Sequence, residues 1–168
     1  MSAVVVNWPF KVVQGGAAVN PPTVKAKAVS LLAQREYSRQ ELSDKLKAED
    51  ASPEEVEQAL AQLAAKGLVD DTRVVETLVN RRSGKLGASR LRQELQAKGV
   101  SAELVAETMA DLKGTELARA RAVWQKKFGL LATSATDRNK QARFLASRGF
   151  SGEVVRKIVS GLADDSEQ

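Results

Sequence analysis

The sequence predicts an all-α protein built from three tandem three-helix repeats that are stacked in an elongated, curved array. Of the 168 residues 43% are hydrophobic but only 4% are aromatic, a composition that disfavours a large sheet. From about residue 25 onward, apolar residues recur at the spacing of one helix face. The pattern returns after about 49 residues, an interval typical of stacked supersecondary units with a concave binding face.

The last helix of each repeat carries the clearest signal. Ser52, Ser101 and Ser151 are each followed by a glutamate and then by apolar residues at i, i+4 and i+7. A serine here can accept a hydrogen bond from the free N–H groups of a helix start, and an acidic first turn suits the helix dipole. We therefore expect a helix after each serine, with a capping box between Ser52 and Glu55. The apolar positions are Val56, Leu60 and Leu63; Val105, Met109 and Leu112; and Val155, Val159 and Leu162.

Two further helices precede each of these serines. Leu42, Leu91 and Leu145 mark the middle helices, and apolar-periodic segments at 26–35, 74–82 and 117–128 predict the first ones. Asp70-Asp71 can cap the helix that follows, and residues 129–137 are expected to form a loop. A left-handed residue that ends a helix is expected at Gly67, Gly99, Gly114 and Gly149.

The predicted domain organisation places the repeats between two terminal segments. Residues 1–22 have no helical pattern and contain Gly15-Gly16 and Pro21-Pro22, which favours a flexible extension. Within it, Val4–Val6 with Trp8 and Phe10 leaves a strand or a partner-docking segment open. The predicted parts are an extension (1–22), repeat 1 (23–71), repeat 2 (72–114), repeat 3 (115–162) and an acidic tail (163–168).

The residue types that are missing argue against most enzyme classes. The chain has no cysteine and no histidine, which excludes disulfides, thiol catalysis, Cys/His metal sites and Ser-His-Asp triads. It contains no Gly-rich phosphate loop and no apolar stretch of about 18 residues. We expect a cytoplasmic protein without catalytic residues, metal or cofactor, and no membrane partner.

Charge is distributed unevenly along the chain. The net charge is +5, but residues 25–71 carry 7 basic and 10 acidic side chains, whereas residues 115–162 carry 10 basic and 3 acidic ones. Such polarity favours a charged partner, a nucleic acid or a nucleoprotein, over a small neutral ligand. A solvated surface whose charge only aids solubility is the alternative.

Basic side chains on repeats 2 and 3 are the candidate contacts with a partner or nucleic acid. Charges on helices are often simply solvated, so this assignment stays a hypothesis. Trp124 and Phe128 could stack on bases, but aromatic residues at helical spacing are more often core. The candidates are Arg81, Arg82, Lys85, Arg90, Arg92, Lys98, Arg119, Lys126, Lys127, Lys140, Arg143 and Arg148.

Three specific stretches, one in each repeat, indicate a family. They are Gly67-Leu68-Val69-Asp70-Asp71, Arg92-x-Glu94-Leu95-x3-Gly99-Val100, and Lys140-x2-Arg143-Phe144-Leu145-x2-Arg148-Gly149-Phe150-Ser151. With the three tandem repeats, they resemble the RecX family of bacterial regulatory proteins over about residues 25–162. Three departures are Val69 where the family usually has leucine or a similar residue, Gly87-Ala88 where many relatives have Gly-Pro, and Asp50-Ala51 in place of the glycine before the first serine.

The resemblance implies a modulator, mainly an inhibitor, of the RecA recombinase. Such a protein lies in the helical groove of the filament that RecA forms on single-stranded DNA. It opposes filament growth, ATP hydrolysis, strand exchange and LexA co-protease activity, and so acts in DNA repair, recombination and the SOS response. No catalysis and no cofactor are implied.

Two other functions are alternatives to this one. The first is direct nucleic-acid binding by helix-turn-helix-like units, which tight and strongly salt-dependent binding to bare DNA would reveal. We expect only weak binding to bare DNA, and a monomer. The second is a Mg²⁺-dependent nuclease at Asp70-Asp71, but helix capping explains these carboxylates more simply.

Overall fold

The computed structural model describes residues 22–162, and this part of the chain forms nine α-helices and no strand. The all-α class is therefore confirmed. Apart from Pro22, the predicted extension with its apolar segment Val4–Val6, Trp8 and Phe10 lies outside the described residues, as does the acidic tail. The helices are α1 (Val24–Leu32), α2 (Arg39–Lys47), α3 (Pro53–Ala65), α4 (Asp71–Arg82), α5 (Ala88–Ala97), α6 (Ala102–Lys113), α7 (Glu116–Lys127), α8 (Ala135–Ser147) and α9 (Gly152–Val159).

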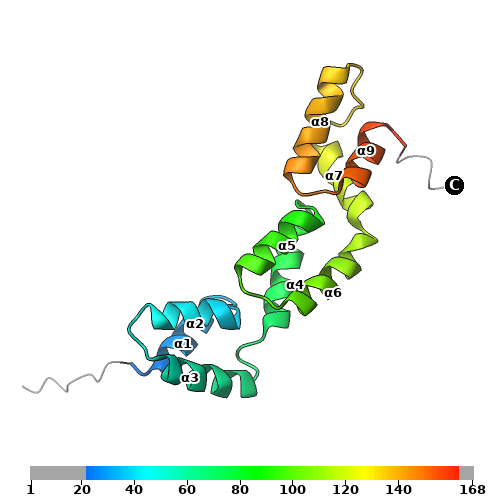
Figure 1. The fold of residues 1–168 in the computed structure, drawn as a ribbon. Helices are drawn as coiled ribbons and strands as arrows, with labels where there is room; N and C mark the ends of the chain where they lie inside the picture. Colours follow the sequence, from blue (N-terminus) through cyan, green and yellow to red (C-terminus); the bar gives the residue numbers. More distant parts are fainter. Residues whose placement is uncertain (1–21, 163–168) are drawn as a thin grey trace, which may run out of the picture.

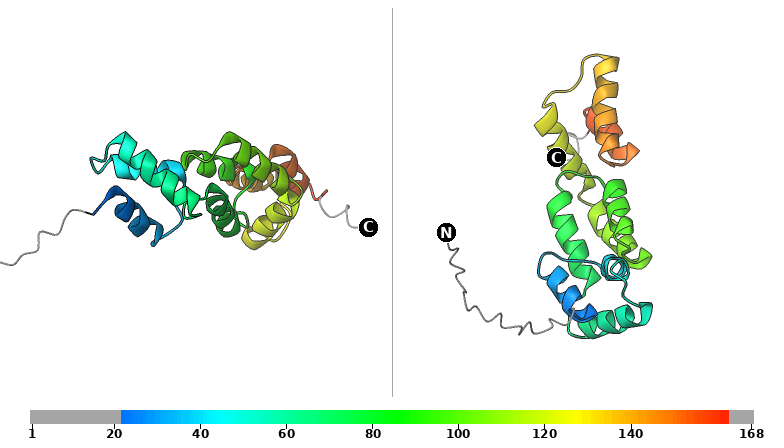
Figure 2. Two further views of the ribbon diagram at one scale, coloured as in Figure 1. Left: turned by 90° about the horizontal axis from the view of Figure 1, so that it is seen from below. Right: turned by 90° about the vertical axis from the view of Figure 1, so that its left-hand side faces the viewer.

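These helices pack in three consecutive groups of three, which we call repeats 1, 2 and 3. Each repeat has its own cluster of buried side chains, centred on Leu42 and Leu60, on Leu91 and Leu95, and on Leu145. The repeats follow one another along an elongated, curved array (Figure 1), and both views in Figure 2 keep the same order. The core is thus divided along the chain.

The predicted helix starts at the three serines are confirmed. The hydroxyls of Ser52, Ser101 and Ser151 accept the backbone N–H of Glu55 at 3.2 Å, of Leu104 at 3.3 Å and of Val154 at 3.4 Å. The Glu55 carboxylate accepts the Ser52 N–H at 3.2 Å, which completes the capping box. Equivalent residues in each repeat therefore start equivalent helices.

Three of the four glycines end helices as predicted, and one does not. Gly67, Gly99 and Gly149 adopt left-handed φ angles of 68°, 70° and 85°. The prediction for Gly114 is wrong, since its φ is −63°. The reason is that α6 leads into α7 through Gly114 and Thr115 with right-handed backbone and no reversal of the chain.

Two other boundaries also differ from the predictions. Helix α8 begins at Ala135, inside the predicted loop, because the Ser134 hydroxyl caps it by accepting the Asp137 N–H at 3.0 Å. Helix α9 ends at Val159, so Leu162 lies beyond it and is 63% exposed rather than part of the core. Lys85 lies in the loop after α4, which ends at Arg82.

The middle helices of neighbouring repeats meet end to end. At the start of α2, the Ser38 hydroxyl donates to the carbonyl of Lys98, which ends α5. At the start of α5, the Gly87 N–H donates to the carbonyl of Arg148, which ends α8, at 2.9 Å. The positive end of each helix dipole thus lies against the negative end of the next one. Polar contacts, not a shared apolar core, therefore set the register between repeats.

Candidate functional site

A basic cleft of about 510 Å³ lies between repeats 1 and 2. Its floor contains the buried apolar side chains of Val74 and Leu78. Its walls are formed by the loop between α1 and α2, by α4, by the loop after α4, and by α5. The charged lining residues are Arg35, Glu36, Arg81, Arg82, Lys85, Glu94 and Lys98. The structure thus brings together four of the predicted candidates and adds Arg35.

Arg82 is compensated within its own repeat. Its guanidinium donates to both carboxylate oxygens of Glu94, from Nε at 3.1 Å and from Nη2 at 2.6 Å. The hydrogen bond from Arg82 lowers the pKa of Glu94 below its usual value, and the same bond raises the pKa of Arg82. This paired geometry fixes the guanidinium and leaves little of its charge for a ligand.

Arg81 and Lys85 supply the uncompensated charge of the cleft. Both side chains are exposed, and within residues 22–162 neither forms a hydrogen bond or an ion pair. Two free cations above an apolar floor, in a concave setting, favour an anionic group over a neutral one.

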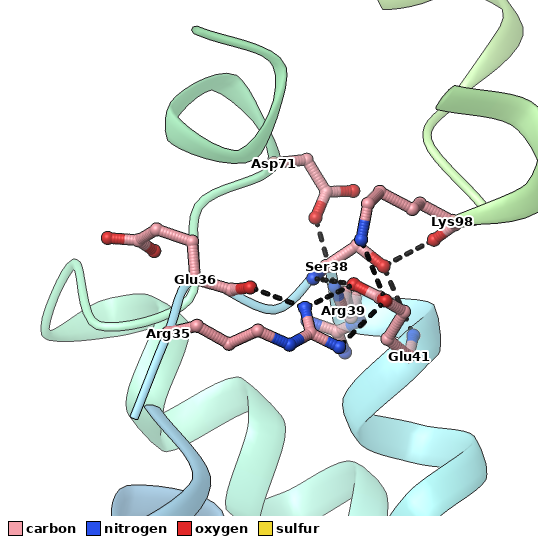
Figure 3. A network of polar contacts seen from close by, with 7 residues as sticks. All are labelled: Arg35, Glu36, Ser38, Arg39, Glu41, Asp71 and Lys98. Carbon is pink, nitrogen blue, oxygen red and sulfur yellow. Dashed lines mark hydrogen bonds and ion pairs between the residues drawn. The ribbon is translucent and has the colours of Figure 1, made fainter. Parts of the chain in front are cut away.

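Glu41 joins repeats 1 and 2 at the edge of the cleft (Figure 3). Its carboxylate accepts Nη2 of Arg35 at 3.1 Å, Nζ of Lys98 at 2.9 Å and the Ser38 N–H at 3.1 Å. Burial by itself would raise the pKa of Glu41, but these three donors outweigh burial and hold the pKa below its usual value. One carboxylate therefore compensates two of the cations that line the cleft.

A carboxylate also links each pair of repeats, a feature that is not predicted from the sequence. Asp71 accepts the N–H of Arg39 at 2.9 Å, and Glu116 accepts the N–H of Ala88 at 3.3 Å. Each acid is the first residue of the first helix in its repeat, and each caps the middle helix of the preceding repeat. The sequence signal for this link is an acid at the first position of the first helix in repeats 2 and 3. In repeat 1 that position is occupied by Val24. Asp70 caps α4 through the Thr72 N–H at 2.9 Å, as predicted.

Arg119 is held inside the fold. Its guanidinium donates to the carbonyls of Ser83 at 2.9 Å, Leu86 at 2.8 Å and Leu112 at 3.3 Å. Burial lowers its pKa from the usual value. This side chain therefore ties repeat 3 to repeat 2 and offers little to a partner.

The remaining basic candidates lie outside the cleft. Arg90 donates to Gln93 at 3.3 Å, and the Arg148 guanidinium lies 5.0 Å from the centre of the Phe144 ring. On α5, α7 and α8, exposed cations without a partner among the described residues add basic surface. They are Arg92, Lys126, Lys127, Lys140 and Arg143.

Three aromatic side chains of repeat 3 belong to its core or pack against it: Phe150, Trp124 and Phe144. Trp124 packs against the cluster of buried residues there and donates its Nε1–H to Gln141 at 2.9 Å. Phe128 and Phe144 meet edge to face with ring centres 5.3 Å apart. These contacts agree with the core interpretation for Trp124, whereas Phe128 is half-buried at the edge of the cluster and contacts it through Phe144.

The described part of the chain shows neither a metal-binding cluster nor a membrane-spanning helix. Within residues 22–162, no three side chains of the metal-binding types gather in one place. No helix in that part of the chain has both the length and the apolar character needed to cross a bilayer.

Comparison with protein families gives three consecutive matches. The model for the first three-helix domain of RecX matches residues 25–63, that for the second matches residues 70–109, and that for the third matches residues 115–159. The matches fall on the three observed repeats.

Individual relatives agree with these matches. "Regulatory protein RecX" of Leptothrix cholodnii is 42% identical over 142 residues, covering 84% of this chain and 90% of the relative. The protein of the same name from Ralstonia nicotianae is 39% identical over 151 residues, covering 88% and 95%. Among solved structures, RecX from Lactobacillus salivarius has a TM-score of 0.71 at 18% identity, covering 83% of this chain and 94% of its own.

Proposed function

The chain belongs to the RecX family of regulatory proteins, and from this membership we propose that it binds the RecA recombinase and its filament on single-stranded DNA. We propose further that it modulates the filament, mainly by inhibiting filament growth, ATP hydrolysis, strand exchange and co-protease activity. The observation that carries the proposal is the match of all three repeats to the three RecX domains. Such a protein acts by binding, in the cytoplasm, as a monomer and without a cofactor.

The elongated array supports this mode of action. An array of three repeats, each with its own core, presents a longer surface than a compact globule of the same chain length. A surface of this kind can contact several protomers of a filament at once. Contacts along the array then add up, which favours the filament over a free protomer.

The charge pattern supports an orientation on the filament. Repeats 2 and 3 are basic, and the free cations Arg81 and Lys85 in the cleft suit the phosphates of the bound DNA strand. The acidic first repeat would then face basic parts of the recombinase. Charge reversals in repeat 1 should therefore weaken the contact with the recombinase, and charge reversals in repeats 2 and 3 should weaken the contact with DNA. If both sets of reversals weakened the same recombinase contact equally, this orientation would be contradicted.

ATP hydrolysis by the recombinase on single-stranded DNA tests the proposal. The protein is titrated in from far below stoichiometric amounts, and its binding to bare DNA is measured at the same salt concentration. Loss of hydrolysis at sub-stoichiometric amounts, with weak binding to bare DNA, is the expected result. Unchanged hydrolysis together with tight binding to bare DNA would instead support direct nucleic-acid binding. In that case log K for bare DNA should fall by about 0.7 per neutralised phosphate for each tenfold rise in salt.

A further inference from the structure

The two junctions between repeats are built differently. At the junction of repeats 2 and 3, two backbone hydrogen bonds cross directly, from the Gly87 N–H to the Arg148 carbonyl at 2.9 Å and from the Ser89 N–H to the Gly149 carbonyl at 3.1 Å. Within residues 22–162, no backbone-to-backbone hydrogen bond crosses the junction of repeats 1 and 2. That junction depends on side chains.

Ion pairs are prominent among those side-chain contacts. Lys98 pairs with Glu41 at 2.9 Å, and Arg73 pairs with Glu36 at 3.4 Å. In the first pair, the side chains keep 27% and 20% of their exposure, so solvent and salt reach them. A competing charge can therefore displace one partner far more easily than it could break the backbone contacts at the other junction.

Lys98 belongs both to this junction and to the basic cleft, and Arg35, whose contacts lie within repeat 1, shares the same carboxylate partner. Arg35 and Lys98 line the cleft, and both donate to the single carboxylate of Glu41, which is not itself a lining residue. A ligand drawn in by the free charges of Arg81 and Lys85 meets these two cations next. It can engage them fully only by taking them from Glu41.

We propose that the cleft binds a phosphate-type polyanion in competition with Glu41, so that an occupied cleft releases the junction of repeats 1 and 2. Repeats 2 and 3 stay together, because two backbone hydrogen bonds and Arg119 hold their junction, whereas the capping carboxylates Asp71 and Glu116 act alike at both junctions. The array thus bends at one junction when it meets phosphate. Glu36 and Glu94 also line the cleft, but they are engaged by Arg73 and Arg82.

The proposal deepens the proposed function, because it adds regulation to the surface assigned to phosphate contacts. It rests on that function only in the choice of ligand, since binding and bending are measured without any recombinase. Failure of the bending test with normal inhibition of the recombinase would overturn the bend alone. A normal bend without inhibition would overturn the proposed function alone.

Fluorescence energy transfer across each junction tests the bend in the full-length protein. The chain has no cysteine, so introduced cysteines are the only labelling sites. Ala61→Cys with Ala106→Cys spans the junction of repeats 1 and 2, and Ala106→Cys with Ala146→Cys spans the other one; all three alanines are exposed on helices. Inorganic tripolyphosphate is the probe, with sodium chloride at equal ionic strength as the control. Calorimetry records binding.

We expect tripolyphosphate to change energy transfer across the first junction only, and beyond the change that sodium chloride causes. Absence of binding, equal changes at both junctions, or binding without a change at the first one would each overturn the proposal.

Two variants separate binding from bending. Glu41→Gln removes the competing charge but keeps a capping-box side chain at this helix position. It should bind tripolyphosphate about 5-fold or more tightly than the parent does, since coupling is reciprocal. Without ligand, its energy transfer across the first junction should already equal that of the parent with tripolyphosphate bound. The double variant Arg81→Ala, Lys85→Ala should bind weakly and keep the ligand-free transfer. Glu153→Gln, which breaks the exposed ion pair with Lys157 in repeat 3, is the matched control and should behave as the parent. Unchanged affinity in Glu41→Gln would contradict competition.

Discussion

Asp50 and Gly99 occupy equivalent positions 49 residues apart and share a left-handed backbone, with φ of 64° and 70°. Only Gly99 faces another repeat. A Cβ added at Gly99 would collide with Cβ and Cγ of Gln40 at the start of α2. Asp50 follows the middle helix of repeat 1, and its side chain is exposed. A side chain is therefore tolerated at residue 50, whereas stacking requires glycine at residue 99.

Substituting asparagine at these two positions separates the effect of the contact between repeats from the effect of a left-handed backbone. Asparagine accepts the left-handed conformation, so Gly99→Asn mainly adds the collision with Gln40. We expect it to destabilise the protein by about 1–3 kcal/mol, the usual cost of overpacking. Asp50→Asn should change stability by less than about 0.5 kcal/mol. Urea unfolding followed by circular dichroism compares them, and equal losses would refute the role of stacking.

Gly87 and Gly84 provide a second matched pair within one loop. A Cβ at Gly87 would collide with the backbone of Gly149 and Phe150, whereas one at Gly84 would meet nothing within 4 Å. Neither glycine has a positive φ. Gly87→Ala should therefore cost about 1–3 kcal/mol or more and separate repeat 3 from repeat 2, because backbone atoms cannot move aside as a flexible side chain can. Gly84→Ala should be neutral within about 0.5 kcal/mol. Thermal unfolding and small-angle scattering report the two effects.

The repeats were predictable from sequence, but the contacts between them were not. A helix start such as the one at Ser52 depends on neighbours within three residues, so the local pattern suffices. The junction joins Ser38 to Lys98 across 60 residues, and no periodicity signals such a contact. Asp71 looks in the sequence like any acid in a first helical turn. The basic cleft was missed as a unit for the same reason, although four of its cations were predicted.

The buried carboxylate of Glu116 should contribute strongly to stability. It is 7% exposed and accepts the Ala88 N–H at 3.3 Å, the Ser151 N–H at 3.3 Å and the Ser151 hydroxyl at 3.0 Å. Both N–H groups donate to Oε1 and the hydroxyl donates to Oε2, so Glu116→Gln places an NH2 group against the Ser151 hydroxyl and removes the negative charge that strengthens the other two hydrogen bonds. We expect a loss of about 1–3 kcal/mol in the free energy of unfolding. Glu103→Gln, at an exposed first-turn position in α6, is the control, and a similar loss there would argue against a specific role for Glu116.

Acid should weaken the junction of repeats 1 and 2 through Glu41. Its pKa in the folded protein lies below the usual value of about 4.3, so its stabilising effect is complete above that pH and is lost as the pH falls through the folded pKa. The chain has no histidine, so no imidazole titration overlaps with this change. The stability difference between the parent and Glu41→Gln should be constant from pH 8 to about pH 5 and shrink below about pH 4. Urea unfolding across this range measures it; a difference that grows in acid would contradict the assigned pairing.

Charge reversal in the cleft should reduce inhibition of the recombinase. The double variant Arg81→Glu, Lys85→Glu reverses the two cations that have no partner among the described residues, and neither substitution breaks an ion pair. If these side chains contact filament phosphates, the concentration needed for half-inhibition of ATP hydrolysis should rise at least tenfold, because each close phosphate contact adds favourable, salt-dependent binding. The rise should shrink as salt increases, since screening weakens both attraction and repulsion.

Lys66→Glu is the control for this reversal. Lys66 is an exposed cation of repeat 1 that lies outside the cleft, just after α3, and it has no partner among the described residues. Because the reversal changes net charge without touching the cleft, it should alter half-inhibition by less than about threefold if the effect is local. If the shift per reversed charge were the same in both variants, inhibition would depend on the overall charge of the protein, and the cleft would have no particular part in contacting the filament.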